Sequence, residues 1–364
     1  RPRYYKQGNE NLFEASKREA KNVRQNVGVC DVTTLGKIDI KGPDAAEFLN
    51  RVYTNAWLKL PVGKARYGVM LREDGIVMDD GTTTRISENH YHMTTTTAQA
   101  ANVLSHLEYY LQLVWPELNV NVVSTTEQWA GAAIAGPKSR DLLQKLFPNS
   151  DVSNEGLPFM GYMEGDLFGV KARIFRISFS GELAYEVNVE SDNGNFMWEK
   201  IIEVGNEFKI LPVGSEASHV LRVEKGFLSL GHEVDGTVDA YDLGMSWLMS
   251  KKKMDYIGKR SVNLRRGEKS QGRRELVGLL TIDPNEAIPE GAPITPRGEK
   301  VGTEGFTTAC VWSVVNKRWV GLALLDDGHS RHGEEACIRM KDKIIRAEIT
   351  KPIFHDPDGK LLRS

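Results

Sequence analysis

A repeated segment constrains the fold of this chain more than any other feature. Residues 38–49 (IDIKGPDAAEFL) and 132–143 (AAIAGPKSRDLL) both contain an apolar run, a Gly-Pro pair and an amphipathic stretch. Glycine permits a sharp turn, and proline needs no amide donor in the first turn of a helix. Each copy therefore predicts a strand, a turn and a helix, with Asp44 as a possible cap of the first helix. Two copies indicate two related α+β units rather than a solenoid. Chance similarity is the alternative, because Gly-Pro before a helix is common.

Periodicity and turn residues predict the elements around the repeat. The pattern indicates a hairpin over residues 67–84 that turns at Glu73-Asp74-Gly75. We expect further strands at 91–97, 171–178 and 184–189, and helices at 98–114, 196–208 and 216–226.

The composition changes near residue 250. Basic and polar residues dominate 251–275, and short apolar runs between Gly and Pro turns follow. The fold class we predict is α+β with a C-terminal β domain. We expect a discontinuous first domain at 1–50 and 132–250, a second α+β domain at 51–131, a linker at 251–275 and the β domain at 276–364.

Charge and cysteine content exclude several classes of protein. The 364 residues carry 47 Lys and Arg against 49 Asp and Glu, a net charge of −2. That balance argues against a nucleic-acid-coating protein or a polybasic membrane binder. No apolar run suits a membrane span or a signal peptide. Three scattered cysteines suit no disulfide framework, so we expect a cytoplasmic location. The chain also lacks an initiator Met, which is consistent with a fragment or a processed piece.

Several catalytic templates are absent. The sequence contains no Gly-x-Gly-x-x-Gly after a strand and no Walker loop, and Ser180 lacks the first glycine of a nucleophile elbow. The pairs His90/His92 and His329/His332 have no third ligand at a clear spacing, so we expect no metal site. The run 251–253 is interpreted as a solvated face.

Two acidic positions offer more chemistry. Asp79 and Asp80 follow an apolar run, and strand alternation puts them on opposite faces, one toward a cavity and one toward water. Such a carboxylate can act as a base or stabilise a cation, although Asp-Asp-Gly also suits a plain turn. Glu186 alternates with apolar residues, and a buried glutamate needs a partner. That partner is either a ligand with paired N–H donors or Arg173 or Arg176.

The chain resembles the folate-binding aminomethyltransferase family, whose namesake is the glycine cleavage T-protein, and within it the sarcosine oxidase α-subunit branch. The resemblance runs from about residue 1 to 364. Its motifs, in order, are DVTTLGK (31–37), GPDAAEFLN (42–50), GIVMDD (75–80), RISFSGE (176–182), HVLRVEKG (219–226) and IGKRS (257–261). The family implies a three-domain cloverleaf around a central hole that binds tetrahydrofolate, with two α+β domains and a C-terminal β-barrel or jelly-roll-like domain.

The resemblance also implies roles for individual residues. Asp80 matches the essential carboxylate, which lies near the N5/N10 edge of the folate. Tyr67 matches an aromatic residue that borders the folate, and Glu186 matches the glutamate that accepts hydrogen bonds from the pterin. Trp247 matches a tryptophan of the pocket wall, and Arg331 is placed near the cavity.

Three positions depart from the T-protein pattern. Phe179 replaces a tyrosine, Ser218 replaces a pterin-contacting arginine and Thr96 replaces an asparagine. These changes argue against a lipoamide-linked T-protein. They leave open weaker folate binding or a repacked pocket, with Phe179 and Thr96 still bordering it.

The implied reaction divides the work between subunits. A flavin on a partner oxidises sarcosine to an imine, and tetrahydrofolate in this chain captures the methylene to give 5,10-methylenetetrahydrofolate and glycine. FAD or FMN and NAD are expected elsewhere in the complex, because this chain carries no motif for them. Two alternatives remain: a free-standing folate-dependent aminomethyltransferase or demethylase with another methyl donor, and a non-catalytic structural subunit.

Overall fold

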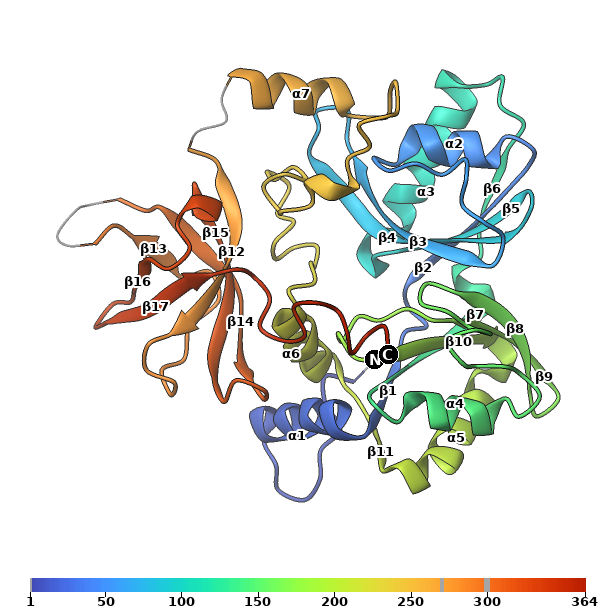
Figure 1. The fold of residues 1–364 in the computed structure, drawn as a ribbon, viewed down its shortest axis with the longest axis horizontal. Coiled ribbons are helices and arrows are strands. Elements are labelled where there is room, and N and C mark those ends of the chain that lie inside the picture. The colour runs from blue at the N-terminus through green and yellow to red at the C-terminus, as the bar shows by residue number, and fades with distance from the viewer. Residues whose placement is uncertain (1, 269–271, 298–301) are drawn as a thin grey trace.

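The computed structural model describes residues 2–268, 272–297 and 302–364. The chain forms three units, built on a six-stranded sheet, a five-stranded sheet and a C-terminal barrel. Both chain termini lie near the centre (Figure 1). The expected class, two α+β units and a β domain, is confirmed. Among the described residues, no helix is both long and apolar enough to cross a membrane.

The first unit is built on a six-stranded sheet. Its strand order is β11 (Ile210–Pro212), β1 (Val27–Asp31), β7 (Trp129–Ala135), β10 (Ala184–Glu190), β9 (Val170–Phe175) and β8 (Tyr162–Leu167). Helices α4 (Ser139–Leu146) and α5 (Gly194–Gly205) contribute buried leucine, methionine and isoleucine side chains to the same core as this sheet. Helices α1 (Leu12–Gln25) and α6 (Ser215–Lys225) form a smaller core between this unit and the barrel.

The second unit is built on a five-stranded sheet. Its order is β3 (Lys64–Leu71), β4 (Val77–Ser87), β5 (His90–Thr95), β2 (Gly36–Lys41) and β6 (Asn121–Ser124). Helices α2 (Ala45–Val52) and α3 (Ala100–Tyr109) complete its core, and a π-helical turn over Tyr110–Val114 extends α3. The structure thus places β2 and α2 in this unit, whereas we expected residues 36–50 in the first domain.

The two copies of the repeat adopt the same backbone geometry. Gly42 and Gly136 have φ values of +144° and +132°, and the residues that precede α2 and α4 both lie at φ −97°. Each copy joins a central strand of its own sheet to a helix on that sheet. The predicted cap is wrong: Asp44 makes no capping bond and accepts the Asn119 amide at 2.8 Å instead.

The third unit is a closed barrel. Its strands, in order, are β12 (Arg274–Thr281), β15 (Arg318–Asp326), β14 (Gly305–Ser313), β13 (Pro293–Thr295), β16 (Glu335–Arg339) and β17 (Ile344–Thr350). One hydrophobic core joins this barrel to β3, to α6 and to residues 228–256, which follow α6 in the chain. The barrel is therefore packed onto the first two units.

The expected linker is ordered over much of its length. It contains α7 (Lys259–Glu268), and the Arg266 guanidinium donates to Asp239 and Asp242 at 2.5 and 2.8 Å. The prediction that residues 251–253 form a solvated face is wrong at Lys253. This lysine is buried and donates to the backbone oxygens of Tyr53 and Asn55. Residues 269–271 of this expected linker lie outside the described residues.

Candidate functional site

Asp80 lies in β4 and is held by one hydroxyl group. Tyr67, on the neighbouring strand β3, donates its hydroxyl to Asp80 Oδ2 at 2.6 Å. Burial raises the pKa of Asp80 to about 6, and the Tyr67 hydrogen bond opposes that rise. Strand β4 runs straight through Asp79-Asp80-Gly81, so the alternative of a plain turn is wrong. At neutral pH the site therefore holds a carboxylate that is largely ionised.

Asp79 occupies the opposite face of β4 and is fully buried. Its Oδ2 accepts the Thr96 amide at 3.2 Å, and its Oδ1 has no hydrogen-bond partner in the part of the chain that the structure describes. Burial, followed by the charge of Asp80, raises the pKa of Asp79 to about 7. The prediction that Asp79 and Asp80 lie on opposite faces of the strand is correct. The prediction that one of them faces water is not, because Asp80 is itself half-buried.

Glu186 projects from β10, and no described residue provides a counter-ion within 4 Å. Burial raises its pKa to about 7, and the positive charge of Lys37 opposes the rise. Across the described ranges, no hydrogen bond or ion pair joins Glu186 to another side chain. The arginine alternative is wrong, because Arg176 donates to Asn154 and to backbone oxygens, whereas Arg173 stacks on Trp129 with 4.0 Å between its guanidinium carbon and the ring centroid.

The remaining predicted residues lie in different settings. Phe179 is half exposed and stacks on Phe227 with 6.1 Å between ring centroids, while Trp247 is 72% exposed. Arg331 is engaged by Glu304 and Glu334 of the barrel unit, each at 3.0 Å.

The structure thus brings some of the predicted residues together. Asp80 contacts Tyr67 directly, and Asp79 links this pair to Thr96. Among the described residues, no hydrogen bond or ion pair joins that group to Glu186, Trp247 or Arg331. Their place in one site stays a prediction.

A polar cluster beside Tyr67 escaped the sequence analysis. Asn55 donates its side-chain amide to the Tyr67 carbonyl at 2.8 Å, and its buried Oδ1 has no partner among the residues described. Lys253 donates to the Asn55 carbonyl at 3.1 Å, and burial lowers its pKa to about 7. The two residues are 198 positions apart, so no local pattern could have paired them.

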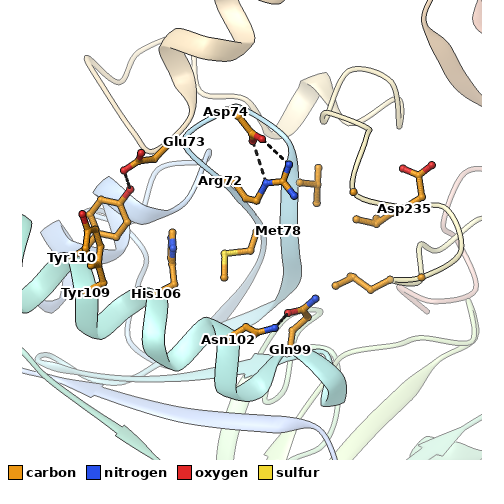
Figure 2. A pocket seen from close by; sticks show the side chains of 15 residues that line it. Arg72, Glu73, Asp74, Met78, Gln99, Asn102, His106, Tyr109, Tyr110 and Asp235 are labelled. Carbon is orange, nitrogen blue, oxygen red and sulfur yellow. Dashed lines mark hydrogen bonds and ion pairs between the residues drawn. The ribbon is translucent and has the colours of Figure 1, made fainter.

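A cavity of about 1030 Å³ lies between the β3–β4 turn, α3 and the loop 230–236 (Figure 2). Val77 and Met78 line it at the start of β4, where the pairing with β3 is irregular, and Asp80 follows two residues after Met78. Around the cavity, Arg72 pairs with Asp74 at 2.6 Å, and the Tyr110 hydroxyl donates to Glu73 at 2.7 Å. None of the predicted site residues lines this cavity.

His90 and His92 share one acidic partner, Asp39. Asp39, on the adjacent strand, contacts His90 Nε2 at 2.9 Å and His92 Nδ1 at 2.8 Å. In the described parts of the chain, no group of three His, Cys, Asp or Glu residues is placed to hold a metal ion.

Comparison with known proteins identifies both parts of the chain. Residues 1–253 match the GCVT N-terminal domain, and residues 274–356 match the glycine cleavage T-protein C-terminal barrel domain. The aminomethyltransferase of Alkaliphilus metalliredigens is 31% identical over 96% of this chain and 91% of its own length. The aminomethyltransferase T of Bartonella henselae has the same fold, with a TM-score of 0.83 at 21% identity, covering 94% of this chain and 90% of that one.

Higher identity is found with part of a longer protein. Sarcosine oxidase subunit alpha is 45% identical in Rhizobium meliloti (strain 1021) and 46% identical in Corynebacterium sp. (strain P-1). The matches cover 96% and 98% of this chain but only 36% and 37% of those relatives. The chain therefore spans little more than a third of their length.

Proposed function

Since this chain belongs to the glycine cleavage T-protein family of aminomethyltransferases, we propose that it transfers a one-carbon unit with tetrahydrofolate, with Asp80 as its catalytic residue. Membership of the family makes it an enzyme domain. The observation that carries the proposal is the Asp80–Tyr67 pair, a half-buried carboxylate held by a hydroxyl rather than neutralised by a cation. Such a group can stabilise positive charge on a reacting carbon.

The acidic residues of the site fit a reduced pterin. A pterin ring presents neighbouring N–H donors, and a carboxylate that has no partner of its own can accept two of them. Glu186 is such a carboxylate. Tyr67, Phe179, Thr96, Trp247 and Arg331 are proposed to border the same ligand. When bound, tetrahydrofolate supplies the nitrogen atoms that accept the one-carbon unit.

The residues of this chain have separate roles in the proposed reaction. Glu186 orients the ring by accepting hydrogen bonds, and Asp80 holds negative charge beside the incoming carbon. Tyr67 fixes the Asp80 carboxylate through its hydroxyl. Burial around Asp80 strengthens its field and limits the access of water, which would otherwise release the carbon as formaldehyde.

The proposed donor is the imine formed when sarcosine is oxidised. Support comes from identities of 45% and 46% to sarcosine oxidase alpha subunits across almost the whole chain. The products would be 5,10-methylenetetrahydrofolate and glycine. In this proposal, flavoprotein subunits of a hetero-oligomer make the imine, and FAD or FMN and NAD bind elsewhere in that assembly.

One observation favours a second candidate, a free-standing folate-dependent aminomethyltransferase. The 31% identical aminomethyltransferase matches this chain over 91% of its own length, so a chain of this size suffices for that enzyme. Copurification separates the two candidates: a flavoprotein bound to this chain supports the sarcosine-oxidase-type assembly, and its absence favours the free-standing enzyme.

The Asp80→Asn variant tests the catalytic assignment. Asparagine keeps the shape of the side chain but removes its charge, so we expect tetrahydrofolate to bind within about threefold of wild type while transfer slows by about 10²-fold or more. Calorimetry measures the binding and single-turnover assays measure the transfer. Unchanged transfer by a folded Asp80→Asn protein would show that Asp80 is not the stabilising group.

A further inference from the structure

Asp79 is the most enclosed acidic group of the site, and the mechanism above does not use it. Its side chain is fully buried, with one backbone amide, that of Thr96, at Oδ2 and no partner for Oδ1 among the described residues. An ionised carboxylate in such a place needs a cation or several donors. Asp79 has no cation among the described residues, and its burial and the like charge of Asp80 raise its pKa more than the hydrogen bonds from Thr96 and the Asp80 amide lower it.

The groups that face Asp79 act in opposite directions on its pKa, but burial and the charge of Asp80, which favour the neutral acid, outweigh the hydrogen bonds that favour ionisation. Asp80 on its own strand contributes a like charge, and Tyr53 and Tyr67 are neutral hydroxyls whose own ionisation Asp79 opposes. Thr96 supplies the amide contact. Because the Tyr67 hydroxyl donates to Asp80 and not to Asp79, the pair places its negative charge on Asp80.

We propose that Asp79 is a positioning residue for the reaction proposed above: it keeps one proton on the Asp79–Asp80 pair, leaves the charge on Asp80 and holds Thr96 at the edge of the site. Thr96 directly precedes the turn Thr97–Gln99 that leads into α3, so the contact also ties β4 to that helix. This inference rests on the proposed function, because it acts through Asp80.

The pH profile of folate-dependent transfer tests the inference. At saturating tetrahydrofolate, where the ionisation of Glu186 no longer limits binding, the wild type should gain activity as Asp80 ionises and lose it again as Asp79 ionises, by about tenfold per pH unit on the alkaline side. Asp79→Asn mimics the protonated acid, so it should keep the acidic limb and lose the alkaline one. An unchanged alkaline limb overturns the inference. So does an Asp79→Asn protein that binds tetrahydrofolate but is inactive at every pH.

A measurement independent of activity completes the test. In a Glu186→Gln background, which removes the other acid of the site with a pKa of about 7, the infrared band of a protonated carboxylic acid should be present near pH 6.5 and should be largely lost when Asp79→Asn is added. The control Asp74→Asn, which changes an exposed aspartate paired with Arg72, should keep the band. Should Asp79→Asn fail to fold, Asp79→Ser removes the same carboxyl and serves instead.

The outcomes distinguish this inference from the proposed function. A wild type that transfers carbon to folate, together with a Glu186→Gln protein that lacks the Asp79 band, overturns the inference alone. A Glu186→Gln protein that shows the band, together with a wild type that binds no tetrahydrofolate, overturns the proposed function and, with it, the role of Asp79 in that reaction.

Discussion

Asp80 depends on a single neighbour for its charge. Among the described residues, the Tyr67 hydroxyl is the one side-chain group that lowers its pKa against the effect of burial. Hydrogen bonding to the charged form of a carboxyl favours ionisation, so the phenol stabilises the ionised state of Asp80 as well as fixing its carboxylate.

The Tyr67→Phe variant tests this dependence. Without the hydrogen bond the Asp80 pKa rises further above about 6, and the acidic limb of the pH profile moves upward with it. We expect about a three- to tenfold loss of transfer at pH 6, which shrinks toward pH 8. Tyr110→Phe, which removes a comparable bond to Glu73, is the control and should leave the acidic limb in place. An acidic limb that does not move in Tyr67→Phe contradicts the assignment.

The residue types of the site were predictable, whereas their contacts were not. Alternation along a strand put Asp79 and Asp80 on opposite faces from sequence alone. The Thr96 amide reaches Asp79 because the chain turns out of the sheet after β5, and that depends on non-local strand pairing. Arg331 has two acidic partners in the barrel unit. One of them, Glu304, is 27 residues away, and the local sequence around Arg331 does not predict that contact.

At the scale of elements, the Gly-Pro turn defines both α+β units. A Cβ at Gly42 would lie 2.2 Å from the Asn119 carbonyl oxygen, and one at Gly136 would lie 2.4 Å from the Asn26 carbonyl oxygen. Both glycines also have positive φ values. The turn therefore needs glycine for the space as well as for the backbone angle.

Alanine substitutions separate these two requirements. Gly42→Ala and Gly136→Ala should each lower the free energy of unfolding by about 2–4 kcal/mol, because backbone atoms must move. Gly236→Ala, at φ +89° with open space around it, should cost only about 1 kcal/mol. Urea denaturation measures all three. Equal losses would show that the close carbonyl contacts contribute nothing.

Most of the predicted elements occur, but their grouping into units was not readable. The helix predicted at 216–226 is confirmed as α6, which ends before Gly226 at φ +73°, and the hairpin 67–84 is confirmed as β3 and β4. The placement of β2 was missed because a strand chooses its sheet by distant pairing, here with β5 and β6. Local periodicity carries no information about that choice.

At the scale of the whole molecule, one buried arginine links the six-stranded unit to the barrel. Arg24 of α1 donates to Glu224 of α6 at 2.6 Å and to Glu182 at 2.9 Å. Glu224 in turn accepts the Ser313 hydroxyl of the barrel at 2.7 Å, and His355 contacts Glu182. The cluster connects the N-terminal helix, the six-stranded unit and the barrel.

Removing this arginine should destabilise the whole chain. Arg24→Met leaves two buried carboxylates without their cation, and we expect a loss of about 3–5 kcal/mol in the free energy of unfolding. Lys145→Met, which breaks an exposed pair with Glu207, should change it by less than about 1 kcal/mol. Denaturant titration compares them. Similar losses in the two variants would mean that the cluster does not hold the units together.

The central claim, that this fold encloses a pterin held by Glu186, is tested most directly by calorimetric titration with tetrahydrofolate. Because the Glu186 pKa is about 7 and the ionised form accepts the N–H donors, wild-type affinity should fall about tenfold from pH 8 to pH 6. Glu186→Gln should bind at least about tenfold more weakly at pH 8 and lose this pH dependence, while Glu190→Gln, at an exposed position of the same strand, should match the wild type. No binding by the wild type, or equal binding by Glu186→Gln at both pH values, would contradict the account.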